Sequence, residues 1–286
     1  MEAVAETKHV VTIALYAFAV AAIALETIVL VARRTPRDQR SRILGVKCGA
    51  LAFGGGALFS VLITLPLMTL AYEHRFFDLG WTWPVWTLCF FINDLMFYTL
   101  HRLEHRVRLL WAVHVVHHSS RHYDLTAGVR GSAFDALVSL PFIVWVPLLG
   151  IHPLIVVMLE TIFRFYGLAY HTEAVGKLGV VDEILVTPSN HRAHHGCNER
   201  YLDCNFGGFF ILWDRLLGTF RPEREAVRYG LVKEWHGYGL ADAQLHEFRD
   251  LARDVQHAPT WRAKLRTLLS PPGAHPEPSS GERATS

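Results

Sequence analysis

The stretch Trp111–Tyr123 reads WAVHVVHHSSRHY and places His114, His117 and His118 at positions i, i+3 and i+4. On an α-helix these positions share one face, so the three imidazoles are expected to point the same way. Neutral imidazole is the commonest metal ligand among protein side chains. The spacing is therefore typical of a helix that binds a metal ion.

The same pattern occurs twice more along the chain. Upstream, YTLHRLEH holds His101 and His105 at i, i+4, and downstream NHRAHHGCN places His191, His194 and His195 at i, i+3 and i+4. A lone histidine is usually a surface residue or a satisfied polar core residue, but three clusters at helical spacing favour metal binding. Eight imidazoles suit a dinuclear site better than a single ion.

Further candidates lie close to these clusters. His171 ends an apolar run before the last cluster, and whether it is a ninth ligand stays open here. Asp94 lies seven residues before His101, two turns away on the same face, where it could orient a ligand histidine or pair with an interior arginine. Cys197 and Cys204 flank the last cluster, but their spacing matches no closed zinc pattern, so we expect them not to be ligands.

Composition indicates a membrane protein. The 286 residues are 51% hydrophobic and 12% aromatic, and their mean hydropathy is +0.22. The apolar residues fall in long runs, which an ordinary soluble domain does not need. The formal net charge of +2 carries no information about partners, and no nucleic acid is expected among them.

The order of the apolar runs predicts the topology. Three runs are long enough to span a bilayer, and two shorter ones form a hairpin that enters and leaves by one side. The arginine-rich loop 33–42 is cytoplasmic by the positive-inside rule, and all three clusters then reach the cytoplasmic face. The runs are Val10–Ala32, Ile43–Leu70 and Pro84–Leu100 for the spans, and Phe134–Leu149 and Pro153–Tyr170 for the hairpin.

The fold class predicted is an all-α integral membrane protein, with about three transmembrane helices plus a helical hairpin and a cytoplasmic, helical, His-rich di-metal cap. Such a multi-pass protein would lie in the inner membrane of a bacterium or the endoplasmic reticulum of a eukaryote. The expected domains are membrane helices and loops over 1–83, a catalytic domain over 84–231, cytoplasmic amphipathic helices over 232–270 and a disordered tail over 271–286.

The clusters also limit the chemistry. Eight or nine imidazoles suit two iron ions that leave positions for O2, and a membrane surface suits oxidation of an unactivated C–H bond on a lipid. Hydrolytic zinc needs about three protein ligands and a general base, so it leaves most of the histidines unexplained. A His-rich protein that only carries or buffers metal is a distant alternative, since transport needs polar residues along the spans.

The motifs resemble a known family. D-x6-H-R-x2-H from Asp94, H-x2-H-H-S-S from His114 and H-R-x-H-H from His191 are similar to the fatty acid hydroxylase/sterol desaturase superfamily of membrane di-iron enzymes. HHSSRHYDLTAGVRGS, TPSNHRAHHGCN and FGGFFILWDRLLGTF most resemble the alkylglycerol monooxygenases within it.

That resemblance implies a function. The eight clustered histidines would be iron ligands, and the ether-linked carbon of an alkylglycerol would be hydroxylated, giving an aldehyde and glycerol. Electrons would come from tetrahydrobiopterin, with Tyr123 and Arg130 near the substrate or the pterin. The alternative is a sterol, fatty acyl or carotenoid hydroxylase or desaturase that takes electrons from a donor protein. Either enzyme would use O2 and a lipid from the bilayer.

Overall fold

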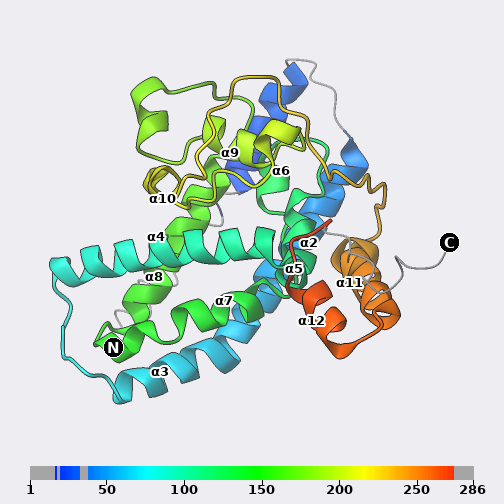
Figure 1. Ribbon diagram of the computed structural model, residues 1–286. Helices are drawn as coiled ribbons and strands as arrows, with labels where there is room; N and C mark the ends of the chain where they lie inside the picture. Colours follow the sequence, from blue (N-terminus) through cyan, green and yellow to red (C-terminus); the bar gives the residue numbers. More distant parts are fainter. Residues whose placement is uncertain (1–16, 18–19, 33–37, 274–286) are drawn as a thin grey trace.

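The computed structural model describes residue 17, residues 20–32 and residues 38–273. Within these residues the chain is helical, and its strand-like pairing is confined to two isolated bridges, Leu185–Phe210 and Gly196–Tyr229 (Figure 1). The all-α prediction is therefore confirmed for this part of the chain. Most of the predicted tail, the start of the first apolar run and loop residues 33–37 lie outside the described residues.

The helices follow one another along the chain, with a long non-helical segment, residues 217–239, before α11. An apolar helix, Val20–Ala32, comes first. It is followed by α2 (Gln39–Phe59), η1 (Ser60–Thr64), α3 (Leu65–Glu73), α4 (Trp83–Arg106), α5 (Arg108–His118), α6 (Leu125–Gly128), α7 (Asp135–Ile143), η2 (Val146–Leu149), α8 (Pro153–Ala169), η3 (Gly179–Glu183), α9 (Pro188–His194), η4 (Glu199–Tyr201), α10 (Leu212–Leu216), α11 (Leu240–His257) and α12 (Trp261–Leu269).

One uninterrupted helix, Gln39–Glu73, is built from α2, η1 and α3. Among the described helices it alone is long and apolar enough to cross a membrane by length and composition. Its π-helical turn Ser60–Thr64 lies just before Pro66, which has no N–H to donate to the preceding turn. The number of membrane spans and their orientation remain predictions.

Both apolar runs of the predicted hairpin are helical, the first as α7 and η2 and the second as α8, while entry and exit by one side of a membrane remain a prediction. Pro141 and Pro147 divide its first arm into a nine-residue helix and a 3₁₀ turn, because proline interrupts the backbone hydrogen-bond ladder. Gly150 then adopts a left-handed conformation, with φ +91°, where an added Cβ would lie 2.2 Å from the carbonyl oxygen of Phe77. The hairpin therefore packs closely against the loop after α3.

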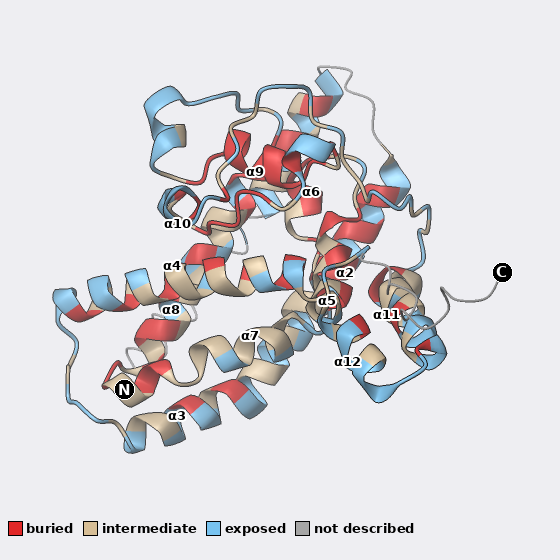
Figure 2. Cartoon of the chain, viewed as in Figure 1, coloured by how far each residue is buried: buried red, intermediate tan, exposed pale blue. Residues whose placement is uncertain are grey.

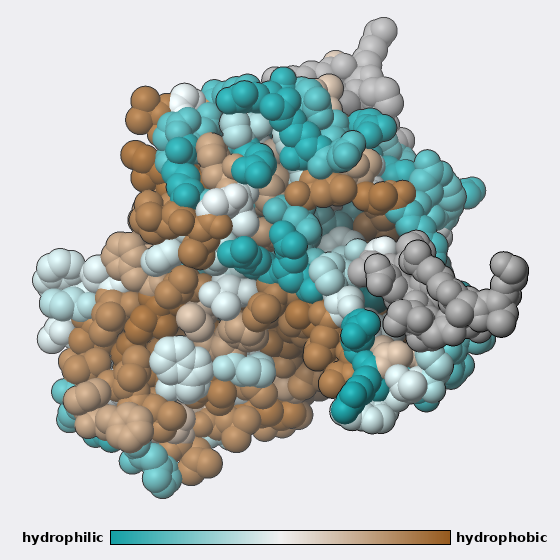
Figure 3. All heavy atoms as spheres, in the orientation of Figure 1, coloured by the Kyte–Doolittle hydropathy of each residue, from teal (hydrophilic) through white to brown (hydrophobic). Residues whose placement is uncertain are grey.

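An apolar core joins α3, α4 and α8. Its buried members include Met68, Val85, Cys89, Ile151 and Ile155, and Figure 2 shows buried residues along the facing sides of these helices. The outer sides of the same helices are also apolar, and in Figure 3 hydrophobic surface gathers over this end of the molecule while hydrophilic surface covers the α9 end. Exposed apolar surface of this extent is typical of a lipid-facing or protein-facing region.

Two glycines let α2 approach the segment that follows α5. A Cβ atom added at Gly45 would lie 2.4 Å from the carbonyl oxygen of Thr126, and one at Gly49 would lie 2.7 Å from that of Val129. Gly54 and Gly55, two turns further on, have nothing within 4 Å of an added Cβ. The close approach is thus confined to the half of α2 that lies beside α6.

The last two helices pack against the outside of α5. Both α11 and α12 contact α5, and α11 also contacts α2. Arg108 at the start of α5 is held by two carboxylates of α11, with N···O distances of 3.0 Å to Glu247 and 2.6 Å to Asp254. The sequence predicted helices over 232–270, and these are the two that form; the domain boundaries themselves remain predictions.

Candidate metal centre

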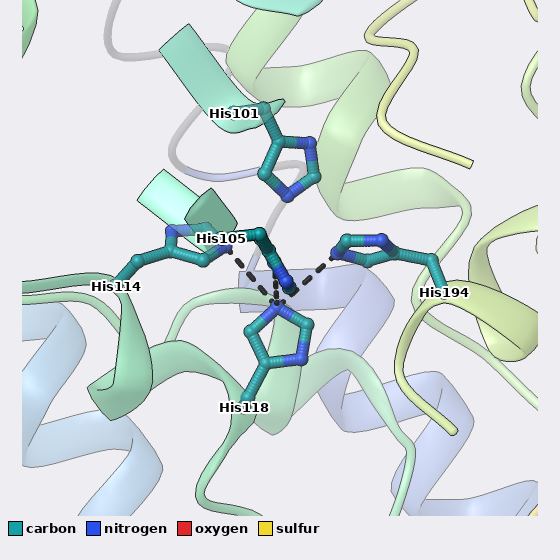
Figure 4. Close-up of side chains that lie close together, drawn as sticks. All are labelled: His101, His105, His114, His118 and His194. Carbon is teal, nitrogen blue, oxygen red and sulfur yellow. Dashed lines mark hydrogen bonds between the residues drawn. The ribbon is translucent and has the colours of Figure 1, made fainter. Parts of the chain in front are cut away.

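Nine histidines meet where α4, α5, α9 and the end of α8 come together. Their ring nitrogens form two groups, and within each group all candidate ligand atoms lie within 4.8 Å of one another. Figure 4 shows the first group, with the rings of α4, α5 and α9 converging. The five-histidine group is His101, His105, His114, His118 and His194, and the four-histidine group is His117, His171, His191 and His195.

The two groups do not coincide with the three sequence clusters. Each i, i+4 pair enters a single group, whereas His117 on α5 and His194 on α9 enter the opposite group from their neighbours. Side chains at i and i+4 are about 40° apart around a helix, while i+3 lies about 100° from i+4. Helices α5 and α9 therefore lie between the two groups and contribute to both.

Backbone carbonyls orient four of the nine rings. Carbonyl oxygens only accept hydrogen bonds, so each of these Nδ1 atoms carries the hydrogen and each Nε2 presents a bare lone pair. The four Nδ1···O contacts are His101 to Phe206 at 2.9 Å, His194 to Cys204 at 2.7 Å, His117 to Arg130 at 3.1 Å and His171 to Gly167 at 2.6 Å.

The lone pairs of the four-histidine group face one another. Nε2 of His171 lies 3.1 Å from Nε2 of His117, and neither atom has a hydrogen to share because both Nδ1 atoms donate to carbonyls. Two lone pairs at this distance repel each other unless a cation lies between them. Two ligands about 2.1 Å from one ion at right angles are about 3.0 Å apart, the separation found here. The donor set therefore fits a metal ion.

The five-histidine group shows the same fit. Nε2 of His118 lies 3.1 Å from that of His114, and 3.2 Å from those of His105 and His194. Nε2 of His101 is buried and has no hydrogen-bond partner among the described residues, although its Nδ1 is satisfied. A buried acceptor left open in this way is available to a metal ion.

Burial keeps all nine imidazoles neutral. Removal from water lowers the pKa of every one of them, for His117 to about 4, and a neighbouring imidazole or arginine lowers each pKa further by repulsion. For His105 the carboxylate of Asp203 acts in the opposite direction and raises the pKa. A neutral imidazole is the form that binds metal. The histidines are therefore ready to act as ligands at neutral pH.

Two carboxylates that the sequence reasoning missed support the five-histidine group. Glu104 Oε2 lies 3.2 Å from Nδ1 of His114, and Asp203 Oδ1 lies 3.7 Å from Nδ1 of His105. Burial raises the pKa of Glu104 well above its usual range. A carboxylate behind a ligand histidine fixes the ring and makes it more basic. The signal in the sequence was the placement of Glu104 at i+3 from His101 on the same helix.

Asp94 has other partners than the histidine or arginine expected from the sequence. Its carboxylate accepts hydrogen bonds from the backbone N–H of Phe209 and from the indole N–H of Trp213, both at 2.8 Å. Seven residues separate Asp94 from His101, but the side chain points to the loop before α10. The physical reason is that this loop brings unpaired N–H donors to a buried carboxylate, which must find partners.

The same loop reaches the metal centre through Phe206. The carboxylate of Asp214, fully buried, accepts the N–H groups of Phe206 and Gly207 at 2.8 and 2.7 Å. The carbonyl of Phe206 in turn takes the Nδ1 hydrogen of His101. Asp94 and Asp214 thus support a ligand histidine indirectly, by holding the loop that orients it.

Tyr123 and Arg130 lie beside the four-histidine group. The Tyr123 hydroxyl donates to the carbonyl of Tyr170 at 2.9 Å, next to His171. The Arg130 guanidinium is 1% exposed and donates to Ser41 at 3.2 Å, while its carbonyl orients His117. Both residues therefore shape the surroundings of the centre, and their contact with a substrate or pterin remains a prediction.

The cysteines follow the expectation from their spacing. Cys204 is buried and its thiol donates to the carbonyl of Tyr201, while its own carbonyl takes the Nδ1 hydrogen of His194. Neither Cys204 nor Cys197 belongs to a ligand group within the described part of the chain. Cys204 therefore contributes a backbone oxygen, not sulfur.

Comparison with known families covers the same segment as the two histidine groups. Residues 86–219, from α4 to the loop after α10, match the family described as fatty acid hydroxylase. All nine histidines fall within this segment. The matched segment makes up a little under half of the chain.

Curated relatives include enzymes that act on lipids. An alkylglycerol monooxygenase of Xenopus tropicalis is 35% identical over 71% of this chain and 46% of its own length. One of Danio rerio is 42% identical over 54% of this chain and 34% of its own length. An ornithine lipid hydroxylase of Rhizobium tropici is 29% identical over 59% of this chain and 52% of its own length.

The chain spans about half the length, or less, of the curated relatives it matches. No solved structure matches it. The segment that matches the fatty acid hydroxylase family contains both histidine groups.

Proposed function

We propose that the chain is a membrane-bound di-iron monooxygenase that hydroxylates a lipid C–H bond, with the ether-linked carbon of an alkylglycerol as its target. The observation that carries the proposal is the pair of histidine groups whose bare, neutral ring nitrogens converge. The alkylglycerol monooxygenase relatives support the substrate class.

Each histidine group would hold one iron ion. Bound iron would supply the activation of O2 that hydroxylation of an unactivated C–H bond requires. The residues of this chain orient the ligand rings through carbonyls and through Glu104. They also keep the imidazoles unprotonated by burial, so that protons do not compete with metal for the lone pairs.

The position of the centre along α4 supports access from a membrane. Trp83, at the start of α4, is exposed next to the aromatic residues Phe76, Phe77 and Trp81. His101 follows 18 residues later, about 27 Å along a helix, while the hydrocarbon layer is about 30 Å thick. If these aromatic residues lie at one membrane–water boundary, the histidines at the other end of α4 lie near the opposite boundary. A lipid could then reach them by lateral diffusion in the bilayer.

The arginine-rich loop supports one orientation of the protein. Asp38, which caps α2 at the end of that loop, donates its N–H to His122 at 3.2 Å, four residues after the ligand His118. Ser41 lies 3.5 Å from Ser120. The loop and the metal centre are therefore at the same end of the molecule, and we propose that this end faces the cytoplasm.

The test is product analysis in membranes that contain the full chain. Given a 1-O-alkylglycerol, O2, iron and tetrahydrobiopterin, the wild type should form the aldehyde, and omission of the pterin should abolish it. His118→Ala should abolish product and lower bound metal. His74→Ala is the matched control, because His74 is exposed after α3 and outside both groups. Full activity and full metal content in His118→Ala would contradict the proposal.

A second candidate rests on the ornithine lipid hydroxylase relative. In that case the chain would oxidise another lipid, with electrons from a donor protein in place of a pterin. The distinguishing result is an iron-loaded protein that gives no aldehyde with tetrahydrobiopterin but oxidises an acyl or sterol lipid when NADPH and a reductase system are supplied.

A further inference from the structure

Helix α12 exposes the side chains that a packing helix would bury. Trp261, Leu265 and Leu269 are 69%, 46% and 53% exposed, whereas Thr267 is 5% exposed. The helix packs on α11 and α5, with Thr267 buried against the protein and Leu268 half-buried, while Trp261, Leu265 and Leu269 face outward. Burying a large apolar side chain is favourable by about 1.5–3 kcal/mol, so packing alone would select the opposite orientation.

The exposed apolar side chains form one stripe with cations on both edges. At about 100° per residue, Trp261, Leu265 and Leu269 fall within an arc of about 80°. Arg262 and Arg266 follow on one side of this arc and Lys264 lies on the other, and all three are exposed. An apolar stripe with basic edges and a tryptophan is the pattern of a helix that lies in a membrane interface. We call Trp261, Leu265 and Leu269 the α12 stripe.

The α12 stripe lies at the depth where a membrane interface is expected. The N–H of Arg108 donates to the carbonyl of Ser270 at 2.9 Å, which joins the end of α12 to the start of α5. Arg108 comes two residues after the end of α4, the end that carries His101 and His105. In Figure 1, α12 lies beside α5, between the polar α9 end and the apolar α3 end of the molecule.

Exposed leucines on both sides of this junction extend the apolar surface. Leu103, at the end of α4, and Leu109, at the start of α5, are both exposed. These leucines and the α12 stripe lie at the same junction, so a bilayer that reaches the end of α4 would also reach α12.

We propose that α12 is an interfacial helix that binds the anionic phospholipid surface of the bilayer. The α12 stripe enters the boundary between headgroups and acyl chains, and Arg262, Lys264 and Arg266 contact lipid phosphates. Because Arg108 is bound to both α11 and the end of α12, the bound helix fixes the height of α5, and with it His114, His117 and His118, above the lipid. The inference does not depend on which reaction the metal centre catalyses.

The first experiment measures lipid contact directly in the full chain. Cys197, the half-buried cysteine, is replaced by serine, and Leu265→Cys is labelled with bimane; the other three cysteines are buried. A second protein carries the label at Glu199→Cys, on the hydrophilic surface. In nanodiscs with shallow nitroxide-labelled lipid, the label at position 265 should be quenched severalfold more than the label at 199. Equal quenching at the two positions would overturn the proposal.

The second experiment tests the charges. Arg262→Glu, Lys264→Glu and Arg266→Glu together should lower quenching at 265 in anionic nanodiscs, since each cation near an anionic surface contributes about fivefold in affinity. In zwitterionic nanodiscs the same three substitutions should change quenching at position 265 only slightly. The matched control reverses three exposed arginines elsewhere, Arg200, Arg221 and Arg224, for the same change in net charge.

Two results would refute the lipid assignment. The control reversal could lower quenching as much as the α12 reversal, which would show a general effect of charge. Alternatively, the fluorescence emission of the label at 265 could move to shorter wavelength without being quenched by lipid nitroxide. That result would mean that residues 274–286 or a second copy of the chain, and not lipid, cover the α12 stripe. Deletion of residues 274–286 distinguishes these two covers.

Discussion

Single histidines differ in how much the metal centre depends on them. The four-histidine group has no ligand to spare, so His171→Ala should reduce its metal binding strongly. The five-histidine group keeps four imidazoles after His101→Ala, and it should lose less. Bound metal per chain, measured by elemental analysis of purified protein, checks this order. His257→Ala, at an exposed position on α11, should change nothing, and equal loss in His101→Ala and His171→Ala would contradict the assignment of ligands to groups.

The carboxylate behind His114 gives a second prediction at this scale. Glu104→Gln keeps the size of the side chain but replaces the carboxyl group whose Oε2 lies 3.2 Å from Nδ1 of His114 with an amide. Loss of such a partner costs about 10- to 100-fold in metal affinity. A competitive titration with a metal chelator should show this weakening in the five-histidine group. Glu199→Gln, at an exposed position, is the control; wild-type affinity in Glu104→Gln would mean that Glu104 does not act on the metal.

Sequence reasoning found the histidines that lie close together but not their division into two groups. Helical periodicity places His114 and His118 on one face because the relation is local. The division of His117 from His118 depends on where α4 and α9 lie around α5, which is a tertiary property. His171 could not be decided from its apolar surroundings for the same reason. The partners of Asp94 were missed because they come from a loop more than a hundred residues away.

At the scale of elements, the glycines of α2 allow a direct test of helix packing. Gly45→Ala places a Cβ atom 2.4 Å from the carbonyl oxygen of Thr126, so α2 or α6 must move. Overpacking of this kind costs about 1–3 kcal/mol. Gly55→Ala meets nothing within 4 Å and replaces glycine in the middle of a helix, which favours the helix by up to about 1 kcal/mol.

Thermal unfolding of the two variants in the same detergent measures this difference. Gly45→Ala should unfold at a lower temperature than the wild type, and Gly55→Ala at the same or a higher one. The opposite order would mean that α2 does not pack against α6 as described.

The apolar runs predicted where the helices lie, but they predicted the ends of the helices less accurately. The run Pro84–Leu100 corresponds to α4, but the helix continues to Arg106 and carries His101 and His105 on the same rigid element. Hydropathy ends the run at the first polar residues, whereas the backbone hydrogen bonds continue through them. The prolines of the hairpin gave a better signal, because their effect on the backbone is local.

For the whole molecule, the metal centre ties together segments that are far apart in the chain. Its candidate ligands come from α4, α5, the end of α8 and α9, and in the absence of a cation the facing lone pairs repel one another.

Metal that binds the folded chain but not the unfolded chain stabilises the fold by about 4 kcal/mol when the free metal concentration is a thousand times the Kd. Removal of metal with a chelator should therefore lower the unfolding temperature by several degrees, and addition of Fe(II) should restore it. A variant that lacks His118 and His194 of the five-histidine group and His191 of the four-histidine group should unfold at the lower temperature with or without chelator. An unchanged unfolding temperature after verified loss of metal would show that the apoprotein holds the nine rings together by packing alone, and the ions would then have no share in the stability of the fold.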